Sequence, residues 1–265
     1  HETVKGISFT GGTATGRIVA QAAAGRFIKA SLELGGKNAT VVFADKVRQM
    51  GDLSSQNQGD ESKRRVEEVA RAVCRAAFLN SGQVCLCGSR ILVQEEIFDE
   101  FVKALVECTE KLKVGDPFDS STDLGPVSSH AHRDKVQSYI DLAREEGGLA
   151  LCGGGQPDWC SPPDQNQAPK PSPPPPGNAS PHGAFLLPTL VTGLDPYTSR
   201  AATEEVFGPF ATIHPFATEE EAISIANATP YGLCASVWTS DLERAHRVSS
   251  KLDVGMVWVN TWLHR

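Results

Sequence analysis

The chain has 265 residues, of which 40% are hydrophobic and 22% charged, a composition typical of one or two globular domains. Its net charge of −7 argues against nucleic acid as a main partner, because a phosphate backbone requires a basic face. No apolar run approaches the ~18 residues of a membrane span, and seven cysteines spread over the length favour a reducing compartment, so we expect a cytoplasmic protein.

The first part of the chain predicts a βαβ arrangement. A short apolar run over residues 4–9 precedes a glycine turn and a stretch with helical spacing that extends to about Ala24. A second apolar segment, Ile28 to Leu34, ends at two glycines, and residues 39–43 resemble a buried strand. Residues 46–65 are polar and without periodicity, so we expect a disordered insertion there.

Two cysteines, Cys85 and Cys87, lie in a predicted loop. An amphipathic helix over residues 66–77 ends near Asn80-Ser81-Gly82, and a strand is expected at residues 91–93. Loops between rigid elements commonly carry chemical groups.

The remainder of the chain predicts an alternation of strands and helices. Residues 156–183 are rich in Pro, Asn, Gln and Ser and predict a disordered or polyproline-like surface insertion. Helices are expected at 97–113, 132–146, 219–228 and 242–251, and strands at 189–191, 235–239 and 255–260. This alternation predicts an α/β fold.

The cysteine pair allows four interpretations: metal ligands, a disulfide, packed core thiols or a nucleophile. Zinc is disfavoured because its sites usually have C-x₂₋₄-C spacing and a second ligand pair, so we expect no metal. A disulfide between residues two apart would be strained. From the cysteines alone, inert core packing is favoured. Two further features shift the balance: the acid Glu33 in an apolar segment immediately before glycines, and the acid pair Glu204-Glu205.

Six motifs in order resemble the aldehyde dehydrogenase superfamily. They are FTGGT (residues 9–13), LELGGKN (32–38), FLNSGQVC (78–85), EEVFGP (204–209), YGL (231–233) and VWVN (257–260). The resemblance covers nearly everything except the two polar insertions. It implies a catalytic domain with a Rossmann-like parallel sheet and flanking helices over residues 36–265, and a remnant of the NAD-binding domain over residues 1–35.

The same resemblance implies the chemistry. Cys85 corresponds to the family's nucleophile, which forms a thiohemiacetal and then a thioester, and Glu33 corresponds to the general base that activates water. Cys87 is expected to have a packing role.

For the cofactor, the resemblance implies NAD, with NADP left open. Gly11 and Gly12 correspond to the turn near the pyrophosphate, and the backbone of Leu34 to a contact with the nicotinamide amide. Glu205 corresponds to the acid that binds the ribose hydroxyls, and Phe207 to the ring beside it.

Within the family, GQVCLCGSR and NTWLHR resemble the branch that oxidises 2-aminomuconic semialdehyde in tryptophan breakdown and its 2-hydroxy analogue. Such aldehyde substrates carry carboxylates, and a guanidinium at Arg265 is suited to binding one. The alternative for Arg265 is an ordinary surface arginine.

The family's enzymes are about twice this length, so the resemblance implies a partial chain of poor activity that lacks the C-terminal oligomerisation segment. The parent enzyme would be a homo-oligomer, a dimer or a tetramer. An alternative hypothesis is a truncated pseudoenzyme that acts as a binding or scaffold protein.

Overall fold

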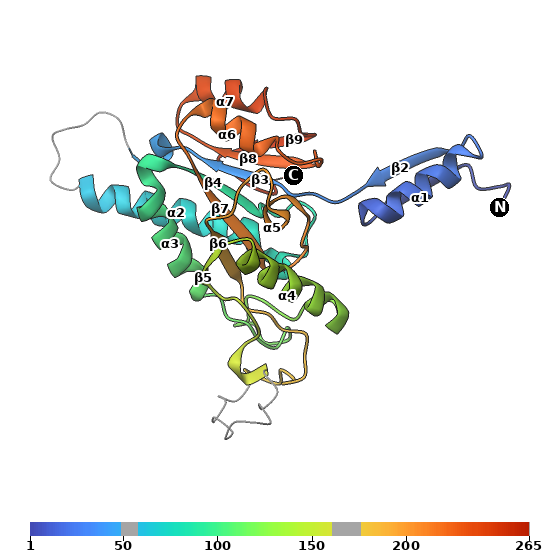
Figure 1. Ribbon diagram of the computed structural model, residues 1–265, viewed down its shortest axis with the longest axis horizontal. Helices are drawn as coiled ribbons and strands as arrows, with labels where there is room; N and C mark the ends of the chain where they lie inside the picture. Colours follow the sequence, from blue (N-terminus) through green and yellow to red (C-terminus); the bar gives the residue numbers. More distant parts are fainter. Residues whose placement is uncertain (49–57, 161–175, 265) are drawn as a thin grey trace.

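The structure is a computed structural model that describes residues 1–48, 58–160 and 176–264 (Figure 1). Its N-terminal unit is a β–α–β element: β1 (Gly6–Thr10) pairs in parallel with β2 (Lys29–Glu33), and α1 (Thr13–Ala24) connects them. This unit projects from the main body (Figure 1), to which residues 34–38 join it. A Cβ added to Gly16 would lie 2.3 Å from a methyl carbon of Leu34, so α1 packs closely on the segment after β2.

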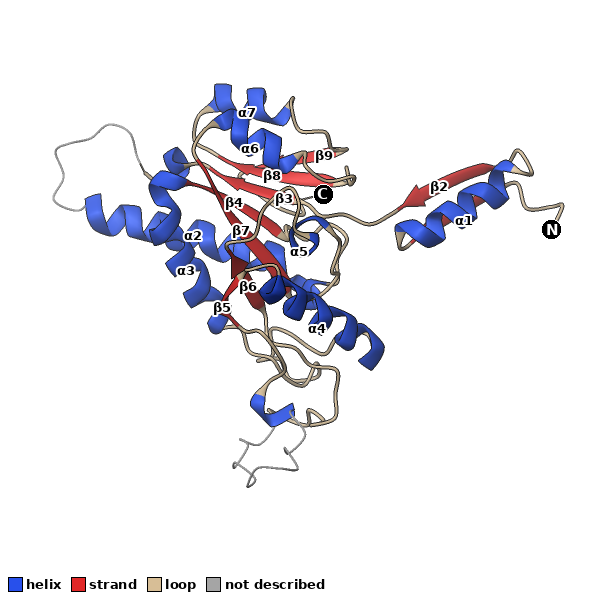
Figure 2. Ribbon diagram, viewed as in Figure 1, coloured by secondary structure: helices blue, strands red, loops and turns tan. Residues whose placement is uncertain are grey.

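The main body is built on one sheet of seven strands in the order β5-β6-β7-β4-β3-β8-β9 (Figure 2). All neighbouring strands are parallel except the edge strand β5, which runs antiparallel to β6. The strands are β3 (Ala39–Val42), β4 (Arg90–Gln94), β5 (Leu149–Cys152), β6 (Thr189–Thr192), β7 (Phe210–Phe216), β8 (Cys234–Trp238) and β9 (Met256–Val259).

Helices cover both faces of this sheet (Figures 1 and 2). They are α2 (Gln58–Phe78), α3 (Phe98–Glu110), α4 (His130–Glu145), α5 (Arg200–Thr203), α6 (Glu219–Ala226) and α7 (Leu242–Ser249), with short 3₁₀ turns at Ala44–Lys46, Leu79–Gly82, Glu95–Ile97 and Asp158–Cys160. Among the described residues, no helix is both long enough and apolar enough to cross a bilayer.

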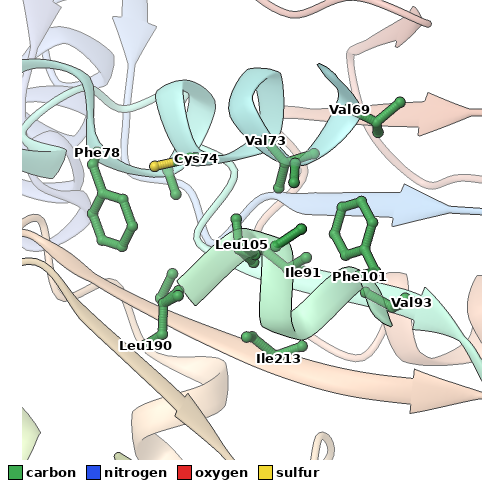
Figure 3. Close-up of a cluster of buried hydrophobic side chains, with 14 of the residues drawn as sticks. Val69, Val73, Cys74, Phe78, Ile91, Val93, Phe101, Leu105, Leu190 and Ile213 are labelled. Atoms are coloured by element: carbon green, nitrogen blue, oxygen red, sulfur yellow. The ribbon is translucent and has the colours of Figure 1, made fainter. Parts of the chain in front are cut away.

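The core follows from the alternation of side chains along the strands. In β4, Ile91 and Val93 point into a cluster with α2 and α3, whereas Leu92 points into the cluster beneath α6 and α7. Figure 3 shows the first cluster, in which Phe101 and Leu105 of α3 lie against these strands, and both are fully buried. Each such side chain contributes about 1.5–3 kcal/mol relative to its exposed state.

Two expectations from the sequence were wrong in part. Residues 58–65 were expected to be disordered but form the first turns of α2. Ion pairs four residues apart, Arg65–Glu61 and Arg64–Glu68, stabilise this polar helix start. Residues 49–57 of the same predicted insertion lie outside the described residues.

The second predicted insertion is also partly ordered. The ring centroid of Trp159 lies 4.9 Å from that of Phe185, and Cys160 and Ala179 are buried in the α2–α3 cluster. The ends of this segment therefore have apolar anchors that its average composition conceals. Residues 161–175 lie outside the described residues.

The expected α/β architecture is confirmed, but two strands were missed. The strand β7 pairs with both β4 and β6, although its sequence FATIHPF contains His214 and Pro215. Its polar side chains are satisfied internally, since a His214 ring nitrogen lies 2.9 Å from Thr212 Oγ1. The other missed strand is β5, an edge strand of four residues.

Candidate active site

The motif residues of the main body gather at one edge of the sheet. Asn38 immediately precedes β3, Cys85 and Cys87 lie on the loop before β4, Gly208 lies just before β7, and Cys234 opens β8. These strands are parallel and occur in the sequence β7-β4-β3-β8 within the sheet, so their amino ends share an edge. Parallel pairing thus brings segments distant in sequence together.

The side chain of Asn38 acts as a clamp that holds the loop bearing Cys85 and Cys87 in place. Its side-chain amide donates to the carbonyl oxygens of Cys85 and Cys87, at 2.7 and 2.9 Å. Its Oδ1 accepts a hydrogen bond of 3.3 Å from the backbone N–H of Cys234. Because Asn38 is only 4% exposed, water cannot readily replace these bonds. The sequence predictions gave this residue no role. The sequence feature that could have revealed it is a polar side chain immediately before a buried strand and two residues after a pair of glycines.

Two glycines permit this close packing. A Cβ on Gly36 would lie 2.8 Å from the carbonyl oxygen of Cys85, and one on Gly82 would lie 2.0 Å from that of Gly208. Gly82 also has a φ of +70°, which side-chain-bearing residues rarely adopt. The turn after α2 therefore lies against the segment before β7. The segment Leu34-Gly35-Gly36 (the LGG segment) lies against the loop that carries Cys85 and Cys87 (the thiol loop).

The three cysteines of this edge differ in exposure. Cys85 is half-buried, whereas Cys87 and Cys234 are buried. Burial raises the pKa of the Cys87 thiol to about 12, and that of the Cys234 thiol also to about 12. These two thiols stay protonated near neutral pH and are poor nucleophiles. Cys85 is the accessible thiol of this set, and none of the seven cysteines forms a disulfide.

Glu205 lies next to the LGG segment. Its Oε1 accepts a hydrogen bond of 3.0 Å from the backbone N–H of Gly36, and a Cβ on Gly35 would lie 2.2 Å from its Oε2. The exposed Phe207 ring stacks edge-on against His132, with centroids 6.0 Å apart. A small cavity of about 10 Å³ is bordered by Glu205, Phe207, Gly36 and Cys87, among others, so both motif residues adjoin the thiol loop.

Glu204 and Lys37 have structural partners at this edge. The Arg200 guanidinium, together with the Tyr139 hydroxyl 2.5 Å from Oε2, lowers the pKa of Glu204. The buried Lys37 donates from Nζ to the Ala201 carbonyl oxygen at 2.8 Å, and its burial lowers its pKa to about 7. Both contacts tie α5, which precedes Glu205, to the rest of the body.

The N-terminal unit carries the other predicted residues. The backbone N–H of Gly11 donates to the Glu33 carbonyl oxygen at 3.0 Å, whereas the Glu33 side chain is exposed and makes no hydrogen bond or ion pair with any other described residue. Gly12 precedes α1 and has open space around its Cα, and the side chain of Leu34 packs on Gly16.

Arg265 lies outside the described residues. Within residues 1–48, 58–160 and 176–264, no group of three or more His, Cys, Asp or Glu side chains has the arrangement of a metal site.

Comparison with known sequences identifies one family. The sequence model described as "Aldehyde dehydrogenase family" matches residues 1–53 and 61–265. The chain is 42% identical over its whole length to 2-aminomuconic 6-semialdehyde dehydrogenase of a Pseudomonas species, of which it covers 47%. It is 43% identical to the mouse 2-aminomuconic semialdehyde dehydrogenase, again covering 47%. The chain thus spans about half the length of the curated relatives it matches.

Solved structures agree with these sequence matches. The chain superposes over its whole length on betaine aldehyde dehydrogenase from Staphylococcus aureus, determined in complex with NAD⁺, with a TM-score of 0.83 and 36% identity. It covers 45% of that protein.

Proposed function

Because the chain belongs to the aldehyde dehydrogenase family, we propose that it contributes the nucleophile to the NAD(P)-dependent oxidation of an aldehyde to a carboxylic acid. The observation that carries this proposal is the thiol loop: the accessible Cys85 is held by the Asn38 clamp, beside two thiols that burial keeps protonated.

In the proposed reaction, the Cys85 thiolate attacks the aldehyde carbonyl carbon and forms a thiohemiacetal. The clamp acts on the carbonyl oxygens on either side of Leu86, so it fixes the loop backbone while leaving the Cys85 thiol unrestrained by that contact. Fixing a nucleophile in this way lowers the entropic part of the barrier. Loss of hydride from the thiohemiacetal carbon leaves a thioester on Cys85, which water then hydrolyses to the acid.

Glu33 is proposed as the base that activates this water. Its exposed carboxylate stands at the end of β2, and the short segment after it, Leu34 to Gly36, reaches the Cys85 carbonyl oxygen. A carboxylate so placed accepts a proton from water as the water attacks the thioester.

The residues present fit a dinucleotide. The first turn of α1 has no side-chain cap, and a Cβ added at Gly12 would have no atom within 4 Å, which leaves room beside the helix N-terminus where anions bind. We propose that Gly11 and Gly12 approach the pyrophosphate, that Leu34 contacts the nicotinamide amide through its backbone, and that Glu205 and Phe207 hold the adjoining ribose and ring. When bound, the nicotinamide supplies the hydride acceptor. NAD is proposed, since a solved relative was determined with NAD⁺.

The proposed substrate is a carboxylated semialdehyde, 2-aminomuconic or 2-hydroxymuconic semialdehyde. Several relatives that share about 40% identity with the chain are named for these compounds. Arg265 is proposed to bind the substrate carboxylate, because a guanidinium forms two parallel hydrogen bonds with such a group.

The division into a nucleotide-binding remnant at 1–35 and a catalytic domain at 36–265 is likewise a proposal. The separate β1–α1–β2 unit in Figure 1 supports it. A cytoplasmic location fits seven cysteines without a disulfide, and a homo-oligomeric parent enzyme remains part of the proposal. No observation favours the pseudoenzyme hypothesis.

The experiment is an assay of NADH or NADPH formation by the full-length parent enzyme. It compares 2-hydroxymuconic semialdehyde with a neutral aliphatic aldehyde and uses both cofactors. We expect Cys85→Ala to abolish turnover and Cys87→Ala to retain most of it. Equal losses in the two variants would contradict the assigned roles.

A further inference from the structure

A cavity of about 500 Å³ lies between the C-terminal halves of α2 and α3. Its size falls within the range of small-molecule sites. Its apolar lining includes Phe78, Leu112 and Leu124, together with Leu79, the first residue of the turn that leads to the thiol loop. The cavity is therefore large enough for a small organic molecule and has a partly apolar lining.

Three cations border the same cavity. Arg71 and Arg75 are four residues apart on α2 and so lie on one helix face, while Lys111 is the C-cap residue of α3. None of the three forms an ion pair or a side-chain hydrogen bond with any residue that the structure describes. The bordering acid, Asp123, is engaged by the backbone N–H of Lys113 at 2.8 Å.

This lack of partners distinguishes the three cations from others on α2. Arg64 and Arg65 lie on the same helix and are paired with Glu68 and Glu61. The lining of the cavity thus combines three cations and one acid with apolar side chains.

Cys108 provides a second observation. This half-buried thiol lines the cavity. Burial raises its pKa, Arg71 and Lys111 lower it, and Glu107 and Glu67 act more weakly in the raising direction. Both cations therefore lie close enough to the thiol to influence its charge. An anion seated between them would also lie near Cys108.

We propose that this cavity binds a small carboxylate-bearing molecule, with its carboxylate among Arg71, Arg75 and Lys111 and its apolar body against Phe78 and Leu124. Guanidinium groups suit this role, because they bind carboxylates through paired, charge-assisted hydrogen bonds. The cavity is separate from the candidate active site around Asn38 and Cys85. Binding of a ligand there does not require that the protein turn over its substrate.

Cys108 alkylation tests the proposal. The purified protein is treated with N-ethylmaleimide, and the labelling rate of Cys108 is followed by peptide mass spectrometry in the presence of adipate, trans,trans-muconate or 1,6-hexanediol. We expect both diacids to slow labelling of Cys108, and the neutral diol of equal chain length to have no effect. Stronger protection by trans,trans-muconate than by adipate would indicate that the site prefers a rigid, unsaturated diacid, and equal protection would indicate a site for diacids in general.

Variants locate the effect. Arg75→Gln should raise the diacid concentration needed for half-protection about tenfold, the loss expected for a charge-assisted contact. Arg64→Gln, on the same helix but away from the cavity, should leave it unchanged. Both side chains are exposed, so neither substitution should unfold α2. Absence of diacid protection, equal protection by the diol, or an unchanged half-protection concentration in Arg75→Gln would overturn the proposal.

Discussion

Substitution of Asn38 by Ala removes the clamp that joins the thiol loop to the start of β8. The three hydrogen bonds lost are those to the Cys85 and Cys87 carbonyl oxygens and from the Cys234 N–H. The Cys87 oxygen keeps a second bond of 3.0 Å from the Ser89 N–H, so the principal cost comes from the other two groups. At about 1–3 kcal/mol for the lost hydrogen bond of each of these two groups, we expect a loss of about 2–6 kcal/mol.

Urea unfolding measures this loss. For a slope of about 3 kcal/mol per molar urea, the midpoint should fall by roughly 1–2 M. Asn227→Ala is the matched control, because Asn227 also uses both ends of its amide, donating to the Lys251 carbonyl oxygen at 2.9 Å and accepting from the Asp253 N–H at 3.0 Å. Asn227 is exposed, so water replaces its bonds and the cost should stay below about 1 kcal/mol.

Asn38→Asp separates the donor from the acceptor. It retains an oxygen for the Cys234 N–H. Its second oxygen takes the place of the Asn38 amide nitrogen, which lies 2.7 and 2.9 Å from the carbonyl oxygens of Cys85 and Cys87. At neutral pH Asn38→Asp should destabilise the protein more than Asn38→Ala does. A negatively charged carboxylate oxygen would then face the partial negative charges of two carbonyl oxygens in a buried place. If Asn38→Ala cost no more than Asn227→Ala, or Asn38→Asp were neutral, the clamp would have no energetic role.

Three further predictions concern other sites. Gly82→Ala should destabilise by about 3 kcal/mol or more in urea unfolding, because its Cβ would lie 2.0 Å from the Gly208 carbonyl oxygen at a φ of +70°; a cost below that of an ordinary surface substitution would contradict the close approach. The Arg247 guanidinium lowers the pKa of Glu219 below its usual 4.5, so this pair stabilises the fold above that pH and loses its effect as pH falls through the lowered value. Glu219→Gln should therefore cost about 1 kcal/mol near neutral pH and converge with the unsubstituted protein in acid melts, and a constant difference at all pH values would exclude this linkage. In the full-length parent enzyme, Arg265→Ala should raise KM mainly for carboxylated semialdehydes in the steady-state assay, and equal effects on a neutral aldehyde would remove the carboxylate contact.

The order of strands and helices could be predicted because most elements have clear periodicity and end signals. The helix Leu242–Ser249 and the strand Cys234–Trp238 are examples. β7 could not, because Pro215 and His214 argue against a strand unless it is known that two neighbours pair with it. The start of α2 was hidden for a related reason: its first turns are polar and are held by ion pairs that local hydrophobicity does not reveal.

For the candidate site, the sequence offered a proposal for the chemistry but no sign of the contacts that support it. Motif order led to the proposal of Cys85 and Glu205 as site residues, and the structure places Glu205 beside the LGG segment through its contact with the Gly36 N–H. The role of Asn38 depends on strand pairing between segments up to 196 residues apart, which no local pattern contains. The cation-lined cavity between α2 and α3 likewise depends on how two helices pack.

The most direct test of the account is the identity of the thiol that becomes acylated. p-Nitrophenyl acetate needs only a competent nucleophile, so the purified protein can be treated with it and the acetyl group located by peptide mass spectrometry. We predict that one acetyl group resides on Cys85, that Cys87→Ala acetylates at the unsubstituted rate, and that Cys85→Ala releases no burst of p-nitrophenolate. Acetylation of Cys87 instead, or an even distribution over the seven cysteines, would contradict the assignment of Cys85 as the nucleophile.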